Sequence, residues 1–375
     1  MMGKWEMVRL GDVLNYEQPT KYIVQSTNYN DNYDIPVLTA GQSFILGYTD
    51  EQENIFSENL PVIIFDDFTT AIQYVDFPFK VKSSAMKILN AQANADIKYL
   101  YYYMSIIRTD TKLHKRYWIS KYSNIKIPLP PLNIQQKITE ILDSTNALIE
   151  KRKEQIAKLD LLVKSQFVEM FGDPVRNPMG WEDEPLSTHL RVVGGYAFDS
   201  NGFKDTGIPV LRIGNINTGS FSSKNLVFWQ YDKKLDRYLL FPNDIVISLT
   251  GTVGKDDYAN ICILGSEHER YYLNQRNAKL ELRNTLNDLF LANILRIPEI
   301  KKKLTGISRG VRQANVSNSD ILNIKLPIPP LELQNRFADF VRAVDESKAK
   351  MQRGLEELEL LYKSLMQKCF SGEIV

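Results

Sequence analysis

The stretch Asn124-Ile-Lys-Ile-Pro-Leu-Pro-Pro-Leu132 recurs almost unchanged as Asn323-Ile-Lys-Leu-Pro-Ile-Pro-Pro-Leu331, which lies 199 positions later. The match continues past the prolines at the same offset, where Gln135 corresponds to Gln334 and the block 161–165 to the block 360–364. Self-similarity at a fixed offset is the signature of a repeated structural unit. The chain is therefore predicted to contain one unit in two copies, and its function must suit a pseudo-symmetric pair.

Each Pro-Pro-Leu motif is followed by a segment that is predicted to be one long helix. Residues 133–171 contain no Gly or Pro, and the apolar residues fall at helical spacing: Ile134, Ile138, Ile141, Leu148, Ile156, Leu159, Val163 and Met170. In the second copy the apolar residues alternate four and three apart, which is the seam of a coiled coil: Met351, Leu355, Leu358, Tyr362, Leu365 and Cys369. A helix of this length extends about 58 Å. If a pseudo-twofold relates the two units, the two helices run antiparallel.

The segments ahead of the two motifs are predicted to be strand-rich globular domains. Short runs of β-branched and aromatic residues, broken by Gly, Pro, Asn and Asp, occur in matching pairs. The predicted strands are residues 35–38 and 208–211, 62–65 and 245–248, and 83–89 and 274–280; residues 66–70 and 251–254 are predicted turns, and residues 96–108 and 288–303 predicted helices. The fold class is α/β (α+β), with two such domains and two long helices. The expected boundaries are 1–127 and 174–326 for the domains, and 128–173 and 327–375 for the helices.

Composition is that of a globular protein, with 43% hydrophobic and 24% charged residues. The two cysteines, Cys262 and Cys369, form no CxxC pattern, which suits a reducing compartment. The N-terminus lacks the apolar core of a signal peptide, and no run of eighteen apolar residues suggests a membrane span. We therefore expect a cytoplasmic protein without a membrane partner.

The distribution of charge repeats along with the sequence. Between Lys21 and Lys80 there are nine acidic side chains and no Lys or Arg, whereas from Lys98 to Lys126 seven Lys or Arg face Asp110 alone. The second copy has the same basic stretch ahead of its motif, between residues 301 and 325. A single basic run is usually a solvated surface, but two in register favour a footprint on a polyanion.

Residue patterns of catalytic sites are not evident. The three histidines, His114, His189 and His268, show neither HExxH nor HxxxH spacing, so a zinc site has no support. The only two Pro-Pro pairs do not lie in the Asn/Asp-Pro-Pro-aromatic loop expected of an adenine methyltransferase. We predict a non-catalytic chain without catalytic residues, metal or cofactor.

The order of these segments resembles the specificity subunit of type I restriction–modification systems. The resemblance covers the whole chain and is most specific at Ile125–Leu132 with Gln135, at Ile324–Leu331 with Gln334, and at Gln313-Ala-Asn315. It implies two target recognition domains that each read one half of a bipartite double-stranded DNA site. It also implies that the helices set the gap and dock two methyltransferase subunits, and that motor-nuclease restriction subunits join the complex. The first domain departs from the second, because Arg116 occupies the position of Asn315; contacts cannot be copied from one domain to the other.

Within this interpretation, Lys and Arg would contact phosphate, and Arg, Asn and Gln would contact base edges. The candidate DNA-binding residues are Lys112, Lys115, Arg116, Lys121, Lys301, Lys302, Arg309, Arg312, Gln313 and Asn315. The aromatic residues Tyr117, Trp118 and Tyr122 are expected to pack beneath the basic segment.

Two alternatives remain open from the sequence. One is a coiled-coil scaffold without DNA readout, and the other is a self-contained DNA nuclease or methyltransferase. The sequence does not reveal which bases are read, the length of the gap, the presence of a restriction subunit or the role of the acidic residues 21–80.

Overall fold

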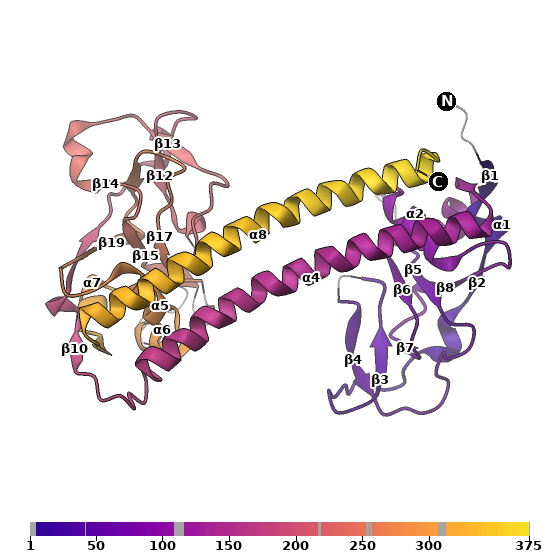
Figure 1. The fold of residues 1–375 in the computed structure, drawn as a ribbon, viewed down its shortest axis with the longest axis horizontal. Helices are drawn as coiled ribbons and strands as arrows, with labels where there is room; N and C mark the ends of the chain where they lie inside the picture. Colours follow the sequence, from indigo (N-terminus) through magenta and orange to yellow (C-terminus); the bar gives the residue numbers. More distant parts are fainter. Residues whose placement is uncertain are drawn as a thin grey trace. The chain divides into compact units, whose positions relative to one another are not determined.

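A computed structural model describes residues 5–41, 43–108, 116–216, 219–252, 255, 257–306 and 313–374. The chain forms two compact units, and each contains one globular head together with a segment of both long helices (Figure 1). The first unit comprises Met1–Lys153 with Arg353–Val375, and the second comprises Glu154–Gln352.

The first head consists of small sheets and short helices. Its strands are β1 (Glu6–Arg9), β2 (Leu14–Glu17), β3 (Ile35–Leu38), β4 (Ile45–Thr49), β5 (Val62–Asp66), β6 (Ile72–Val75), β7 (Lys80–Val81), β8 (Met86–Ala91) and β9 (Lys126–Leu129), and its helices are α1 (Leu10–Val13), α2 (Ile97–Ile106) and α3 (Tyr117–Ser120). An antiparallel sheet has the order β2-β8-β5-β6, and a second has the order β4-β3-β7 with β3 and β7 parallel.

The second head repeats this arrangement. Its strands are β10 (Asp183–Pro185), β11 (Leu190–Gly194), β12 (Ile208–Leu211), β13 (Val227–Trp229), β14 (Leu239–Leu240), β15 (Ile245–Ser248), β16 (Thr250–Thr252), β17 (Ile261–Ile263), β18 (Tyr271–Leu273), β19 (Asn277–Leu282), β20 (Gln313–Asn315) and β21 (Lys325–Pro327), and its helices are α5 (Asp288–Arg296), α6 (Pro298–Thr305) and α7 (Asn318–Asn323). The order β11-β19-β15-β17 matches β2-β8-β5-β6, and the parallel pair β12–β18 matches β3–β7. The duplication predicted from sequence is therefore present in the strand topology. Within the described residues, the short pair β16–β20 has no counterpart among the strands of the first head.

The first and last strands of each head pair with each other and close the head at the proline motif. β1 pairs with β9 and β10 with β21, both antiparallel. The long helices, α4 (Leu132–Phe171) and α8 (Leu331–Ser371), begin directly after the prolines. Proline cannot donate the intrahelical hydrogen bond that a longer helix would need, so it defines where each helix starts.

The repeated glutamine connects each long helix to its head. The Gln135 side chain accepts a hydrogen bond from the Asp96 amide at 2.7 Å and donates to the Pro130 carbonyl at 2.8 Å. The Gln334 side chain likewise accepts from the Asn287 amide at 2.8 Å and donates to the Pro329 carbonyl at 2.7 Å. Both glutamines are fully buried. Asp96 and Asn287 are the N-caps of α2 and α5, so the same side chain holds the head helix and the long helix together in both copies.

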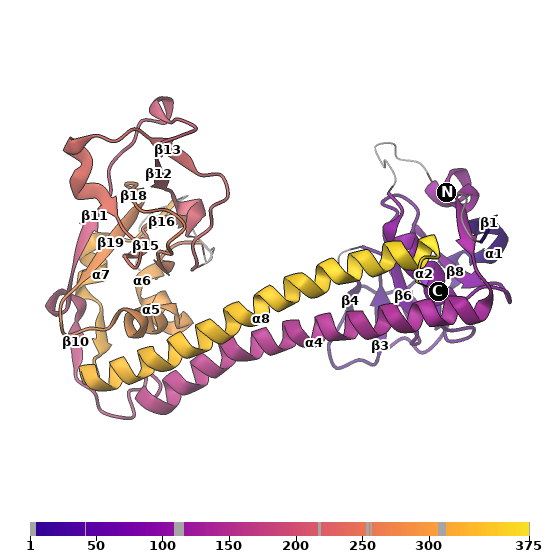
Figure 2. The same ribbon diagram turned by 45° about the horizontal axis from the view of Figure 1, so that its top comes forward.

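Within each unit the two long-helix segments run in opposite directions. In the first unit, Ile138 and Leu142 of α4 share a core with Cys369 and Phe370 near the end of α8. In the second, Phe167 and Phe171 near the end of α4 pack with Phe337 near the start of α8. The expected fold class, strand-rich heads with two antiparallel helices, is confirmed (Figure 2).

One apolar position predicted for the first long helix does not face the interior. Leu148 is 54% exposed, whereas Leu142, Thr145 and Ile149 are buried. These residues follow Ile138 at spacings of four, three and four, so the buried stripe passes through a threonine. An apolar residue off this stripe faces outward.

The predicted helix 288–303 is interrupted. The structure has α5 and α6 in its place, with the break at Ile297-Pro298. Pro298 occupies the first position of α6, where its missing N–H costs nothing, but it could not have continued α5.

Predicted strands 83–89 and 274–280 begin three residues later than expected. Met86 lies opposite Asp66, the last residue of β5, and Asn277 lies opposite Ser248, the last residue of β15. A strand begins where its partner offers hydrogen bonds, and sequence periodicity does not report that limit. Residues 250–252, expected partly as a turn, form β16 because β20 pairs with them.

Candidate nucleic-acid interface

In the first head, the candidate residues flank the short helix α3. Arg116 is its N-cap and Lys121 its C-cap, and both residues are exposed. The aromatic residues between and after them point inward, and Trp118 and Tyr122 contact the Phe65 ring at centroid distances of 5.4 and 4.8 Å. The expectation that Tyr117, Trp118 and Tyr122 pack inward is confirmed, since all three are buried; the basic segment 112–115 lies outside the described residues. The packing leaves the flanking cations in solvent, where they could contact phosphate.

A buried ion pair, which the sequence did not reveal, lies under α3. Asp67 follows β5, and Lys87 lies on β8; their side chains are 3% and 1% exposed, with Oδ2 and Nζ 3.2 Å apart. The second carboxylate oxygen of Asp67 accepts a hydrogen bond from the Trp118 amide at 2.9 Å. Asp67 and Lys87 are twenty positions apart and carry no joint sequence signature, so only the fold brings them together.

In the second head, the candidate segment lies on β20. Asn315 is exposed and lies opposite Thr250, whereas Ala314 between the two candidate positions is buried. At the end of β16, the Asp257 carboxylate accepts hydrogen bonds from the Thr252 amide at 2.7 Å and from the Thr252 hydroxyl at 2.8 Å. The Thr252 amide is the main reason that the pKa of the Asp257 carboxyl is lowered. The Asp257 side chain thus holds the last residue of β16, whose partner strand β20 carries the exposed Asn315.

Lys301 and Lys302 are adjacent on α6 but have different surroundings. Lys302 is exposed, whereas Lys301 is 8% exposed and donates to the Asn260 side chain at 2.6 Å. Lys301 is therefore less suited to a phosphate contact than Lys302, because its amino group is bonded within the head.

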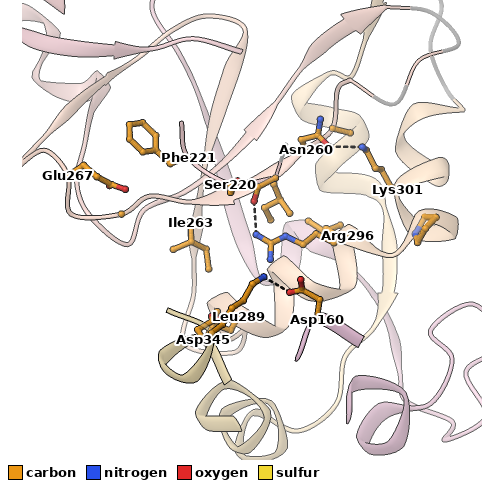
Figure 3. A pocket seen from close by; sticks show the side chains of 17 residues that line it. Asp160, Ser220, Phe221, Asn260, Ile263, Glu267, Leu289, Arg296, Lys301 and Asp345 are labelled. Atoms are coloured by element: carbon orange, nitrogen blue, oxygen red, sulfur yellow. Dashed lines mark hydrogen bonds and ion pairs between the residues drawn. The ribbon is translucent and has the colours of Figure 1, made fainter. Parts of the chain in front are cut away.

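Lys301 also lines a pocket of about 820 Å³ in the second unit (Figure 3). There, Lys348 pairs with Asp160 at 2.6 Å, and the Arg296 guanidinium donates to the Gly219 carbonyl at 2.9 Å. Because Asp160, Glu267 and Asp345 line this pocket together with its cations, it does not present a continuous positive surface.

Several candidates fall outside the described residues. These are Lys112, Lys115, Arg309 and Arg312, and for Gln313 the structure describes only its backbone in β20. Their role stays a prediction.

Neither a metal cluster nor a membrane helix is found in the described parts of the chain. Among those residues, His, Cys, Asp and Glu form no group of three that could hold a metal ion. None of the described helices combines the length and apolarity that crossing a bilayer requires.

The paired heads, closed joints and antiparallel helices define a class of protein, and comparison with known families agrees. The chain belongs to the type I restriction modification DNA specificity domain family, whose family model matches residues 2–159 and 178–360. The predicted class, a specificity subunit rather than an enzyme, is confirmed.

Individual relatives cover different shares of the chain. The EcoR124I/EcoR124II specificity subunit of Escherichia coli is 49% identical over 155 residues, which span 38% of each chain. The MjaVIII specificity subunit of Methanocaldococcus jannaschii is 26% identical over 397 aligned positions, covering 99% of this chain and 93% of its own. The S subunit of the type I system of M. genitalium has the same fold, with a TM-score of 0.61 at 15% identity, over 98% of this chain and 96% of that one.

Proposed function

We propose that each head of this specificity subunit reads one half of a bipartite site on double-stranded DNA. One observation carries the proposal. Arg116 and Asn315 occupy equivalent positions of the repeat, 199 residues apart. Both are exposed, and each directly precedes a buried residue, Tyr117 and Val316. Arginine suits a bidentate contact with guanine and asparagine suits adenine. Equivalent positions with different chemistry are what two heads with different half-sites require.

The test is DNA binding by single variants at these two positions. The site is first identified by mapping methylated motifs in cells that express the chain with its methyltransferase. Arg116→Ala and Asn315→Ala are each expected to weaken binding by about ten- to hundredfold, since one bidentate base contact contributes about 1–3 kcal/mol. Each variant should lose discrimination in its own half-site and keep it in the other.

Other outcomes decide for the alternatives. Unchanged DNA affinity in both variants with failed subunit assembly would favour a scaffold. DNA methylation or cleavage by the purified chain without partners would establish an enzyme.

We further propose that the helices dock two copies of a methyltransferase subunit, with restriction subunits joining the larger complex. The support is a repeated apolar surface. Leu161 and Leu162 on α4 are 59% and 45% exposed, and their repeat equivalents Leu360 and Leu361 on α8 are 65% and 50% exposed. Adjacent to them, Val163 and Tyr362 pack inward in both copies. Exposed leucine pairs at both equivalent positions favour two binding sites for one partner.

Partner stoichiometry tests this surface. Leu161→Glu is expected to leave one methyltransferase subunit bound, as is Leu360→Glu, and the double variant should bind none, as measured by native mass spectrometry. Leu148→Glu is the matched control, because Leu148 is exposed on α4 but its repeat equivalent is Ser347. Two bound subunits in the double variant would refute the proposed surface.

We also propose that the complex is located in the cytoplasm. The support is that both cysteines are free and buried, as in proteins of reducing compartments. Fractionation of cells that express the tagged chain tests this location.

A further inference from the structure

The two heads support their candidate DNA-contacting segments with the same backbone hydrogen bonds. In the first head, the Asp67 amide donates to the Ala85 carbonyl at 3.0 Å, and its carbonyl accepts from the Tyr117 amide at 2.9 Å. In the second head, the Leu249 amide donates to the Arg276 carbonyl at 2.8 Å, and its carbonyl accepts from the Val316 amide at 2.8 Å. Tyr117 and Val316 are themselves 199 positions apart, so Asp67 and Leu249 are structural equivalents.

The side chains at these equivalent positions differ. Strand registers place Lys87 of the first head where the second head has Ala278, because Phe65 lies opposite Lys87 and Ile247 opposite Ala278. The first head therefore has a buried aspartate–lysine pair where the second has leucine and alanine. An ion pair with both partners almost fully buried is costly to desolvate and adds little stability by itself, so its presence calls for another role.

The second head holds its candidate DNA-contacting segment in a different way. Directly after Leu249, β16 pairs with β20, and this ladder holds Asn315 through its own backbone. In the described part of the first head, the segment after Asp67 makes a turn and the matching segment is the short helix α3. In the first head, the Trp118 amide instead donates its hydrogen bond to the Asp67 carboxylate. This bond takes the place of the strand pairing that holds the segment in the second head.

We propose that Asp67 and Lys87 are positioning residues that hold Arg116 and Lys121 in place for DNA recognition by the first head. Asp67 accepts hydrogen bonds from the first turn of α3, through its carbonyl from the Tyr117 amide and through its carboxylate from the Trp118 amide. The ion pair with Lys87 fixes the orientation of that carboxylate. The Lys87 ammonium also lies 5.4 Å from the centroid of the Tyr16 ring, which restricts its position further. The inference rests on the proposed DNA recognition, and it predicts a defect confined to one half-site.

The test combines protein variants with DNA variants. Asp67→Asn removes the charge but keeps the shape of the side chain. Binding is measured to the intact bipartite site and to two probes in which either half is scrambled. We expect Asp67→Asn to lower affinity for the intact site about tenfold, because it releases Arg116 from the position of its proposed base contact. Scrambling the first half should then add no further loss, whereas scrambling the second half should weaken binding as it does for the wild type.

Two further variants keep the outcome interpretable. Asp66→Asn is the matched control, since Asp66 lies next to Asp67 at the end of β5 and its carboxylate accepts from the Phe68 and Thr69 amides. Asp67→Leu with Lys87→Met removes both charges together and leaves no unpaired buried ion, so it remains folded if the single variant does not. It should show the same half-site defect.

A second readout separates this inference from the proposed function. Hydrogen exchange of the Trp118 amide should accelerate in Asp67→Asn and in the double variant, and not in Asp66→Asn. If the DNA affinity of the wild type does not depend on either half-site, the proposed function fails. The exchange rate of the Trp118 amide then still tests whether Asp67 holds α3. Unchanged Trp118 exchange, or an equal loss of affinity for all three probes, would overturn the positioning role.

Discussion

At the scale of single residues, the buried glutamines of the two joints explain why the sequence repeat is strongest there. Gln135 and Gln334 each use both ends of the amide, one to accept and one to donate. No other neutral side chain of that length offers a donor and an acceptor, so the residue type follows from the geometry. The heads can diverge in sequence while this connection stays the same.

Replacing Gln135 by Leu is expected to destabilise the first unit by about 2 kcal/mol or more, because it leaves the Asp96 amide and the Pro130 carbonyl buried without partners. Chemical denaturation measures the change. Gln136→Leu is the control, since Gln136 is exposed one position further along α4. Equal stability of the two variants would contradict the account of the joint.

The buried cysteines lead to a prediction about pH. Burial raises the pKa of the Cys262 thiol to about 11, from an ordinary value of 9.0, and burial also raises the pKa of Cys369. Because the folded state binds the Cys262 proton more tightly than the unfolded state, this thiol's contribution to stability is complete below pH 9.0 and is lost as pH rises towards 11. The thiolate, which is the reactive form, is scarce at neutral pH.

We therefore expect both cysteines of the native protein to resist alkylation near neutral pH and to react fully after denaturation. Mass spectrometry of the alkylated chain gives the extent at each site. Rapid alkylation of native Cys262 at neutral pH would show that its surroundings are more open than the structure has them.

At the scale of elements, the contacts between the heads and the long helices reverse their charge between the two copies. In the first unit, Lys98 on α2 pairs with Asp143 on α4 at 2.7 Å. At the equivalent position in the second unit, Arg342 on α8 lies 3.9 Å from Asp288 on α5. The first contact is the stronger one, because the Tyr102 hydroxyl also donates to Asp143. Burial, followed by this hydrogen bond, raises the pKa of Tyr102, so the hydroxyl stays protonated as a donor.

These differences predict unequal effects of removing the two equivalent side chains. Asp143→Ala should destabilise the first unit by about 2 kcal/mol, the typical contribution of a hydrogen bond to a charged group. Arg342→Ala should cost less than about 1 kcal/mol, as expected for an exposed ion pair. Denaturant titration of both variants checks the order; a larger effect of Arg342→Ala would contradict it.

At the scale of the whole molecule, both long helices contribute a segment to each unit, so the two units share their helical scaffold. We propose that helix length sets the gap between half-sites. Removing one heptad from each helix preserves the antiparallel seam and shortens it by about 10 Å, which corresponds to roughly three base pairs.

Mapping methylated motifs with the shortened chain measures the gap directly. The expected result is a shorter gap between unchanged half-sites. Deleting a heptad from α4 alone is the control, because it disrupts the pairing without defining a new spacing, and it should abolish methylation. The original gap in the doubly shortened chain would exclude the helices as the spacer.

Local patterns in the sequence determined the duplication, the start of each long helix at its prolines and three matching pairs of strands. The class of protein came from the resemblance of the whole order of segments to a known family. Proline chemistry and apolar periodicity act over a few residues, so they can be read directly. The candidates Arg116, Lys121, Lys302 and Asn315 were also predicted from local charge and the repeat, and all are exposed.

The tertiary structure alone decided which of several similar residues faces inward. Lys301 is buried and its neighbour Lys302 is exposed; Leu148 is outside the seam, whereas Thr145 is within it. The Asp67–Lys87 pair depends on the register between β5 and β8. Burial and ion pairing depend on contacts between segments distant in sequence, and these exist only once the strands and helices have packed together.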